Sequence, residues 1–363
     1  MTYRAIGLMS GSSLDGLDIA FVEFHENAGK WTSTILEADC QPYSTEWMDR
    51  LKNAISLNAL QYQLLHTDYG RYIGQQVNAF IQQYGLEYKV ALIASHGHTT
   101  FHMPSRNMTA QLGDGAAIAA ETQLPVVTDL RAMDLAFGGQ GAPIVPVGEK
   151  LLLGEYDYFL NLGGIANISI NAEKYIAFDV CPANRVLNML ANEKGKAYDE
   201  NGSMAASGKV DDALLKELNN LEYYSKPFPK SLANDFGTDT VYRIVRQAGL
   251  PTVDALRTFT EHIALQIAKA IPSKKSISGK GSQILVTGGG ALNKFLIDRL
   301  SDHLQAHDIT VKVPDEKLVN YKEAMIMALI GVLRWRQEYN VYASVTGASR
   351  DSIGGALWTG QEA

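Results

Sequence analysis

Three short glycine-rich segments combine the residue types that hold phosphate groups. They read GSSLDGLD (11–18), NLGGIAN (161–167) and TGGGALN (287–293). Glycines permit positive φ and close approach of the backbone, so N–H groups and serine hydroxyls in such turns can bind phosphate oxygens. The candidate nucleotide-binding residues are Gly11, Ser12, Ser13, Leu14, Asp15, Gly16, Leu17, Asp18, Gly163, Gly164, Asn167, Gly288, Gly289 and Gly290. The three turns predict a site for a phosphorylated ligand.

Asp15 narrows the kind of ligand expected at the first turn. A bare carboxylate beside a triphosphate is repulsive unless Mg²⁺ or its bound waters lie between them, so the turn favours a magnesium nucleotide. An ordinary hairpin closed by Asp-Gly is the alternative. The chain has no GxxxxGKS or GxxxxGKT segment, and Asn293 stands at the last glycine position of a GxGxxG pattern. The sequence therefore favours neither a P-loop enzyme nor a dinucleotide-binding dehydrogenase.

Two similar groups of strands are expected to position the first two turns. Residues 3–9 and 17–24 are apolar runs on either side of the first turn, and a third strand is predicted around 34–38. The pattern returns about 150 residues later, with strands predicted at 156–162, 167–170 and 175–180. We interpret this as an internal duplication of one α/β unit, although a chance match of two hairpins is the alternative.

Further strands and helices place the remaining motifs on a sheet. Strands are predicted at 90–95 and 283–287, each ahead of a turn that contains glycine, and α/β folds bind ligands at the carboxyl ends of their strands. Apolar residues at helical spacing predict a helix over 252–270, and another helix is expected over 293–304. The motifs are thus expected to be loops on a rigid sheet.

Length and composition limit the class of protein. A chain of 363 residues favours two domains, and a net charge of -7 from 32 basic and 39 acidic residues argues against a nucleic-acid partner. The two cysteines, Cys40 and Cys181, form no CxxC pair and indicate neither a disulfide framework nor a thiolate zinc site. No secretory signal or long apolar segment is present, so we expect a cytoplasmic protein without a membrane partner.

The domain boundary is expected between Gly138 and Glu155, because no low-complexity linker separates the halves. We predict a first domain of residues 1–140 with 340–363, and a second domain of residues 141–339. The sequence leaves open whether the chain acts as a monomer or a homodimer.

The amino-acid sequences of nine segments, in this order along the chain, resemble those of the anhydro-N-acetylmuramic acid kinases. The segments are GLMSGSSLDGLD (7–18), SHGHTTFH (95–102), LGDGAAIA (112–119), TDLRAMDLAFGGQGAPIVP (128–146), LNLGGIANIS (160–169), FDVCPAN (178–184), YDENGSMAASG (198–208), TGGGALN (287–293) and SVTGAS (344–349). That family belongs to the acetate and sugar kinase, heat-shock protein and actin superfamily. The resemblance implies an α/β fold of two ribonuclease-H-like, actin-like ATPase domains with an interdomain cleft that closes on ATP.

The resemblance also implies an activity. The family uses ATP and Mg²⁺ to hydrolyse a 1,6-anhydro sugar and phosphorylate it at O6, which gives N-acetylmuramic acid 6-phosphate and ADP in peptidoglycan recycling. A small-molecule sugar is therefore the expected partner. Two alternatives remain, namely a kinase of a simple sugar hydroxyl and an actin-like ATPase that is not a kinase.

The resemblance assigns roles that the residues alone leave open. Asp179, expected at the end of a strand, is either a general base or a turn residue, and the resemblance implies the catalytic base. Glu323, expected at the start of an apolar helix, is either a favourable first-turn acid or a sugar contact, and the resemblance implies the contact. Arg131 and Asp134 hold the lactyl carboxylate and a hydroxyl of the substrate, or pair with each other.

Histidines 96, 98 and 102 lie close together in HGHTTFH, but the HExxH spacing of many zinc enzymes is absent. His96 is expected to donate a hydrogen bond to the substrate or to be a structural histidine. The chain also departs from the family pattern: it reads FDVCPAN at 178–184, where FDTGPGN is more usual, and KSLAND at 230–235, where Gly-Arg-Glu usually follows the Lys-Ser. These departures put local loop shape in doubt more than the acidic positions.

Overall fold

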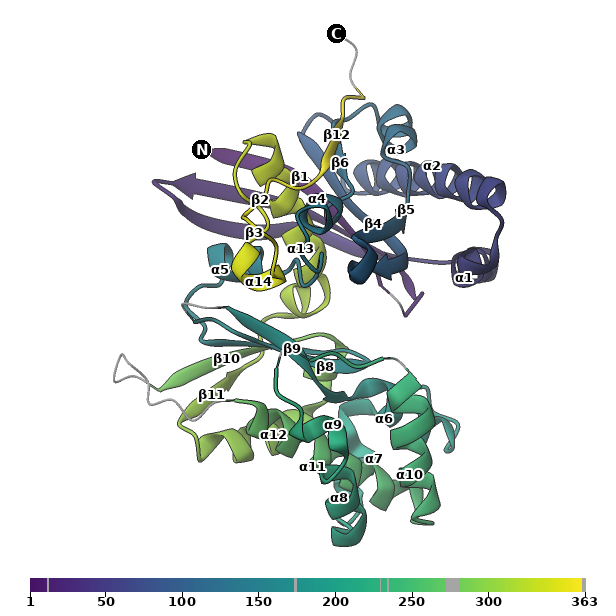
Figure 1. Cartoon of the computed structure of the whole chain (residues 1–363), viewed down its shortest axis with the longest axis vertical. Coiled ribbons are helices and arrows are strands. Elements are labelled where there is room, and N and C mark those ends of the chain that lie inside the picture. The colour runs from purple at the N-terminus through teal and green to yellow at the C-terminus, as the bar shows by residue number, and fades with distance from the viewer. Residues whose placement is uncertain (12, 173–174, 229, 234, 272–280, 361–363) are drawn as a thin grey trace. The chain divides into compact units, whose positions relative to one another are not determined.

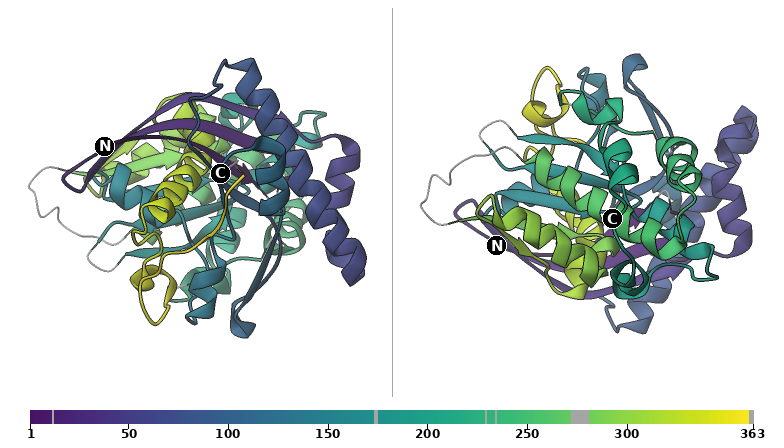
Figure 2. Two further views of the ribbon diagram at one scale, coloured as in Figure 1. Left: turned by 90° about the horizontal axis from the view of Figure 1, so that it is seen from above. Right: turned by 90° about the horizontal axis from the view of Figure 1, so that it is seen from below.

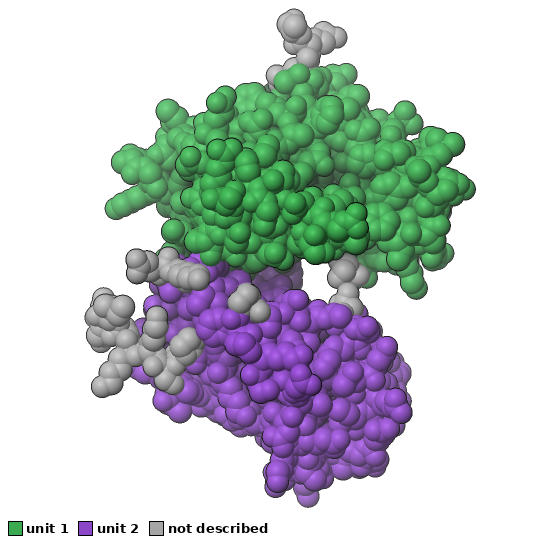
Figure 3. Space-filling model, viewed as in Figure 1, with its two compact units in different colours: residues 1–154, 321–363 green, residues 155–320 purple. Residues whose placement is uncertain are grey.

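The computed structural model describes residues 1–11, 13–172, 175–228, 230–233, 235–271 and 281–360. The chain forms two compact units, one of residues 1–154 with 321–363 and one of residues 155–320 (Figure 3). Each unit contains one mixed β-sheet with helices packed against it (Figure 1). None of the helices in the described ranges is long and apolar enough to cross a lipid bilayer.

The first unit is built on a sheet with strand order β12-β6-β4-β1-β2-β3, and β5 pairs with β4. Its strands are β1 (Thr2–Ser10), β2 (Gly16–Asn27), β3 (Lys30–Pro42), β4 (Leu92–Met103), β5 (Met108–Leu112), β6 (Val126–Thr128) and β12 (Ala356–Trp358). β2 is antiparallel to both β1 and β3, whereas β4 is parallel to β1 and to β6. β1 and β2 read as nearly continuous apolar runs because helices cover both faces of this sheet.

The helices of this unit are α1 (Thr45–Lys52), α2 (Ala59–Gln83), α3 (Gly115–Thr122), α4 (Ala132–Ala136), α5 (Pro146–Leu152), most of α13 (Glu316–Trp335), and α14 (Ala343–Thr346). The helix α2 packs its buried Tyr69, Ile73 and Phe80 into the core formed with β1 and β2, and the view from above in Figure 2 shows it with these strands. α13 approaches β1 closely at Gly7, where an added Cβ would lie 1.8 Å from the carbonyl oxygen of Ala324. Only glycine permits that contact.

The second unit repeats the same plan. Its strands are β7 (Tyr158–Leu162), β8 (Ile165–Ile170), β9 (Ile176–Pro182), β10 (Ser282–Thr287) and β11 (Ile309–Lys312), in the order β11-β10-β7-β8-β9. Its helices are α6 (Asn184–Asn192), α7 (Ser203–Ser207), α8 (Asp212–Asn219), α9 (Glu222–Ser225), α10 (Tyr242–Gln247), α11 (Thr252–Ala270) and α12 (Lys294–Gln305). The predicted face of α11 is fully buried at Leu256, Phe259 and Ile263.

The repeated strand order confirms the predicted fold class. β6-β4-β1-β2-β3 in the first unit corresponds to β11-β10-β7-β8-β9 in the second, with the middle strand of each hairpin triplet antiparallel to its neighbours. Each set is an antiparallel triplet followed by two parallel strands. The internal duplication inferred from the two glycine turns is therefore a duplication of a ribonuclease-H-like α/β unit.

The first boundary between the compact units lies at the end of the range expected between Gly138 and Glu155, but the units differ from the predicted second domain of residues 141–339 at both of its ends. The first unit extends to Gly154 and resumes at Tyr321, so α5 and most of α13 belong to it. α13 joins this unit because small residues let it lie against the sheet: a Cβ on Gly331 would be 2.6 Å from the Cβ of Ala94. Such packing leaves no change of composition in the sequence.

Candidate active site

The first glycine turn joins β1 to β2 and is organised by Asp15. Ser13 Oγ donates a hydrogen bond of 2.7 Å to Asp15 Oδ1, and the Gly16 N–H donates to the same oxygen at 3.1 Å. Ser12 lies outside the described residues. Leu17 is 1 % exposed and belongs to the core, so its side chain supports the turn from below. The carboxylate of Asp15 thus helps to fix the shape of the turn.

Asp18, in β2 after this turn, has two other carboxylates near it. The pKa of Asp18 is raised to about 6, mainly by burial and also by the charges of Asp15 and Glu323, while a hydrogen bond from the Cys40 thiol lowers it in part. A divalent cation would relieve the crowding of negative charge, and carboxylate oxygens are ligands that suit Mg²⁺. The described residues contain no group of three His, Cys, Asp or Glu side chains that could hold a metal ion. Asp15 and Asp18 are therefore the carboxylates near this turn whose chemistry suits Mg²⁺.

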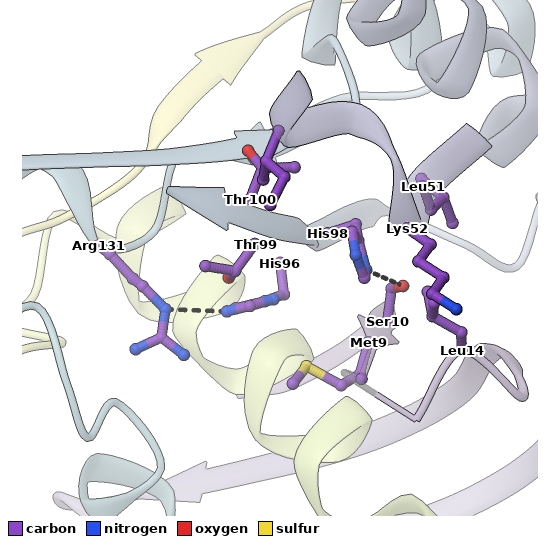
Figure 4. A pocket seen from close by; sticks show the side chains of 12 residues that line it. Met9, Ser10, Leu14, Leu51, Lys52, His96, His98, Thr99, Thr100 and Arg131 are labelled. Carbon is purple, nitrogen blue, oxygen red and sulfur yellow. Dashed lines mark hydrogen bonds between the residues drawn. The ribbon is translucent and has the colours of Figure 1, made fainter. Parts of the chain in front are cut away.

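A cavity of about 290 Å³ opens beside this turn within the first unit (Figure 4). It is lined by Met9, Ser10, Gly11, Leu14, Leu51, Lys52, Ile55, His96, His98, Thr99, Thr100 and Arg131. Among the residues singled out in the sequence, the structure thus brings Gly11, Leu14, His96 and Arg131 around one cavity. Its size is near the lower end of the range for small-molecule sites, enough for a monosaccharide.

His96 and Arg131 are joined at this cavity. Arg131 Nε donates to His96 Nε2 at 2.9 Å, while the other ring nitrogen of His96 contacts the Gly97 carbonyl oxygen at 2.9 Å. Because a guanidinium only donates, His96 Nε2 must accept, so its proton is on Nδ1 and is given to Gly97. Burial and the charge of Arg131 lower the pKa of His96 to about 3, which keeps the ring neutral.

Arg131 and Asp134 are linked through the backbone of Gly141, to which each side chain makes a hydrogen bond. Arg131 Nη1 donates to the Gly141 carbonyl at 2.6 Å, and the Gly141 N–H donates to Asp134 Oδ2 at 2.7 Å. The other oxygen of Asp134 accepts from Thr346 Oγ1 at 2.6 Å. Asp134 is 1 % exposed, so its carboxylate supports the glycine loop from inside the protein.

The sequence suggested that Glu323 lies at the start of its helix, but the structure places it further along. α13 begins at Glu316, so Glu323 lies two turns into the helix and the first-turn explanation is wrong. Burial raises the pKa of Glu323, whereas the positive charges of Lys322 and Arg131 lower it. Lys322 Nζ itself lies 2.8 Å from Glu149 Oε1 in a buried ion pair. Glu323 therefore belongs to a buried charge network that reaches Arg131.

The two glycine turns of the second unit lie next to each other, because β7 and β10 are parallel neighbours. Asn184 Nδ2 donates to the Leu162 carbonyl at 2.9 Å, and the Asn184 N–H donates to the Gly163 carbonyl at 3.1 Å. A Cβ on Gly288 would lie 2.4 Å from Asn161 Oδ1, so the third turn packs directly on the second. The third turn continues as a short 3₁₀ helix over Gly289–Leu292, which contains Gly289 and Gly290. Helix α12 begins beyond it, capped by the side chain of Asn293.

Asp179 lies within β9, three residues before its end, rather than at the end of the strand as expected. Asn167 Nδ2 donates to Asp179 Oδ1, and the Leu232 N–H donates to Asp179 Oδ2 at 2.7 Å. Burial raises the pKa of Asp179, and the hydrogen bonds from Leu232 and Asn167 lower it in part. The strand continues past Asp179 because Cys181 and Pro182 still pair with β8.

The backbone of Asp179 is held as firmly as its side chain. Tyr223 Oη donates to the Asp179 carbonyl at 2.6 Å, and the Asp179 N–H donates to the Lys230 carbonyl at 3.2 Å. Lys230 Nζ lies 4.6 Å from the centre of the Tyr223 ring and donates to the Tyr223 carbonyl at 3.2 Å. A carboxylate fixed in this way at an edge strand can accept a proton from a ligand in one defined direction.

Sequence reasoning missed several residues of these sites. Lys52, the last residue of α1, lies outside every motif quoted above, and no pattern connects it with the cavity. Ser10 lines the cavity and lies 3.0 Å from His98 Nδ1, a contact that only the register of β1 and β4 reveals. Tyr223 and Leu232 reach Asp179 across long stretches of chain. Their discovery required the tertiary structure.

Comparisons with known proteins show the family of this chain. The anhydro-N-acetylmuramic acid kinase family matches this chain over residues 3–360. The anhydro-N-acetylmuramic acid kinase of Francisella tularensis subsp. novicida is 33% identical over 97% of each chain, and that of Shewanella amazonensis is 35% identical over 97% of each chain. A solved structure, the activator of 2-hydroxyisocaproyl-CoA dehydratase from Clostridium difficile with bound ADPNP, is similar at a TM-score of 0.45 and 13% identity over 92% of this chain and 96% of that one. From the family match and the full-length relatives, this chain belongs to the anhydro-N-acetylmuramic acid kinase family.

Proposed function

We propose that this kinase couples two bond changes in one active site. It hydrolyses the 1,6-anhydro bond of anhydro-N-acetylmuramic acid and transfers the γ-phosphoryl group of ATP to O6, giving N-acetylmuramic acid 6-phosphate and ADP. Family membership over residues 3–360 supports the substrate pair. The observation that carries the residue assignment is Asp179, a carboxylate with a raised pKa and both oxygens oriented by N–H donors.

Asp179 is the general base in this proposal. It takes a proton from the water whose oxygen forms the new bond to C1. The bond between C1 and the bridging oxygen breaks, and its electron pair stays on that oxygen, which becomes O6. O6 bonds to the γ-phosphorus while the bond from phosphorus to the ADP oxygen breaks. Water enters opposite the bridge, so the configuration at C1 is inverted.

No separate general acid is needed, because the phosphorus accepts the departing oxygen in place of a proton. Only one carboxylate therefore has to exchange a proton during the chemical step. The proton that Asp179 gains is lost again to solvent before the next turnover. The single base of this mechanism is Asp179, whose side chain and backbone are both held by hydrogen bonds in the second unit.

The cavity of the first unit supplies the sugar contacts. We assign Arg131 to the polar groups of the sugar, since its guanidinium lines the cavity in a fixed orientation. His96, neutral and with its proton directed to Gly97, acts mainly by holding Arg131. Glu323 is assigned to a sugar hydroxyl, and Asp134 supports the Gly141 loop without touching substrate.

The glycine turns hold the nucleotide in this account. The backbone N–H groups of the turns at 11–18 and 161–167 are assigned to the phosphates, and Gly288 to Gly290 to the adenosine. Asp15 and Asp18 would hold Mg²⁺, which when bound would neutralise charge on the transferring phosphoryl group. Because ATP is a cytoplasmic substrate, we also propose that the reaction takes place there. Assembly as a homodimer stays a prediction.

The experiment is to incubate the purified protein with ATP and either anhydro-N-acetylmuramic acid or intact N-acetylmuramic acid. We expect ADP and N-acetylmuramic acid 6-phosphate from the anhydro sugar, in equal amounts. Phosphorylation of the intact sugar alone would refute the coupled reaction and favour a simple hydroxyl kinase. ATP hydrolysis at the same rate without any sugar would favour an actin-like ATPase.

A further inference from the structure

The cavity of the first unit is positively charged. Its lining contains the cations Lys52 and Arg131 but neither aspartate nor glutamate. Its two histidines add no charge at neutral pH, because burial lowers the pKa of His98 and lowers that of His96 to about 3. A cavity with this lining favours a ligand that carries a negative group.

The two cations differ in the hydrogen bonds and the opposite charges that the protein itself supplies to them. Arg131 gives Nε to His96 and Nη1 to the Gly141 carbonyl, and the carboxylate of Glu323 acts on its charge. Lys52 is exposed, and it takes part in none of the ion pairs found among the described residues. Figure 4 shows the two side chains on opposite sides of the cavity, with Ser10 and His98 nearer to Lys52. Lys52 is thus the cation left available for an anionic ligand.

The surroundings of Lys52 add a second requirement. Leu14 and Ile55 also line the cavity, and Leu51 forms its buried wall next to Lys52. Ile55 is 61% exposed, so its apolar side chain is accessible to a ligand in the cavity. This part of the cavity therefore combines a cation with an apolar surface. A group that carries a carboxylate beside a methyl fits that combination.

We propose that Lys52 binds the lactyl carboxylate of the sugar substrate, and that Leu14 and Ile55 contact the lactyl methyl group. This inference rests on the proposed function, because it takes the substrate from it. It assigns selectivity for muramic over glucosamine sugars to Lys52, a residue outside the catalytic chemistry. Arg131 remains with the sugar ring on the other side of the cavity.

Two other roles of Lys52 predict different behaviour. As the last residue of α1, a lysine also complements the negative end of the helix, which would affect stability but not the choice of sugar. An anionic site could also take a phosphate of ATP, in which case loss of Lys52 would weaken ATP binding. The experiment has to separate these three roles.

The test compares Lys52→Gln with the wild type on two sugars, anhydro-N-acetylmuramic acid and its neutral lactyl amide, which has nearly the same shape. Lys30→Gln is the control, since Lys30 is an exposed lysine of the same unit that does not line the cavity. Lys52→Arg should restore the charge. KM and kcat are measured for each sugar and for ATP, and thermal unfolding is followed for every variant.

We expect Lys52→Gln to raise KM for the acid roughly tenfold, which corresponds to about 1.4 kcal/mol, and to leave kcat and the KM for ATP unchanged. KM for the amide should not change, so wild-type preference for the acid over the amide disappears in the variant. Lys52→Arg should recover most of that preference, and Lys30→Gln should behave as wild type.

Equal effects of Lys52→Gln on the acid and the amide would overturn the proposal. So would a rise in KM for ATP alone, which would assign the anion site to a phosphate. Failure of the wild type to act on the anhydro sugar at all would instead refute the proposed function. In that event Lys52→Gln is assayed by binding of the acid and the amide, so the two conclusions stay distinguishable.

Discussion

Removing the hydroxyl of Tyr223 tests whether the position of Asp179 limits turnover. In Tyr223→Phe the ring and its contact with Lys230 at 4.6 Å remain, but the hydrogen bond of 2.6 Å to the Asp179 carbonyl is lost. One hydrogen bond contributes about 1 kcal/mol on average, and Tyr223 is 7% exposed, so water replaces the lost donor poorly. If β9 shifts as a result, the carboxylate loses its fixed direction toward the water. A loss of about 1.4 kcal/mol in the transition state would slow kcat roughly tenfold.

Tyr224→Phe provides the matched control. Tyr224 is the next residue, and its hydroxyl bonds to His262 Nε2 at 2.9 Å instead of to Asp179. Both variants should lower the free energy of unfolding by about 1 kcal/mol, as measured by urea denaturation. Only Tyr223→Phe should lower kcat, with KM for both substrates nearly unchanged. Equal kinetic behaviour of the two variants would refute the positioning of Asp179 by Tyr223.

Three further predictions concern charge and loop geometry. Because the pKa of Asp18 is raised to about 6, its ionised form is disfavoured in the folded protein. Asp18→Asn should therefore stabilise the unliganded protein at pH 8 by about 1–3 kcal/mol. The same substitution should abolish turnover. In the wild type, Asp18 becomes protonated as the pH falls through 6, and the folded protein gains this stability. The difference between variant and wild type in the free energy of unfolding, measured by urea denaturation, should therefore be smaller at pH 4 than at pH 8. A variant less stable than the wild type at pH 8 would contradict the argument. Gly141→Ala, at φ +63 and with a Cβ 2.4 Å from Leu135 Cδ1, should lower stability by about 2–3 kcal/mol and reduce kcat/KM, whereas Gly138→Ala, at φ +79 in open space, should cost about 1 kcal/mol and leave kinetics intact. Finally, the base must be ionised and burial raises the pKa of Asp179, so kcat/KM should fall on the acid side with an apparent pKa above that of a free aspartate, and a limb at the ordinary value would contradict the assignment.

The local parts of the fold could be predicted from the sequence because they depend on neighbouring residues. The alternation and apolar runs around the turns at 11–18 and 161–167 predict β1, β2, β7 and β8 within a few residues. The buried face of α11 follows from its helical spacing. The duplication was visible for the same reason, since each hairpin triplet carries its own pattern.

Other features depend on contacts between distant segments. α13 extends seven residues before Glu323, through a charged segment whose pattern gives no warning that the helix has begun. Arg131 and Asp134 are close in sequence and opposite in charge, yet both bind Gly141 because a folded loop passes between them. Lys52 reaches the cavity only because the fold brings the end of α1 to the same cavity as Ser10 of β1 and His98 of β4. Local sequence patterns do not predict such contacts between distant segments.

Asp179→Asn is the most direct test of the central claim that Asp179 activates the attacking water. The variant keeps the size of the side chain and can still accept from the Leu232 N–H, so the fold and ATP binding should be retained. With ATP and anhydro-N-acetylmuramic acid, single-turnover assays should show a loss of at least about 10³-fold in the rate of product formation. A rate within a few fold of the wild type, with ATP bound normally, would contradict the assignment of Asp179 as the general base.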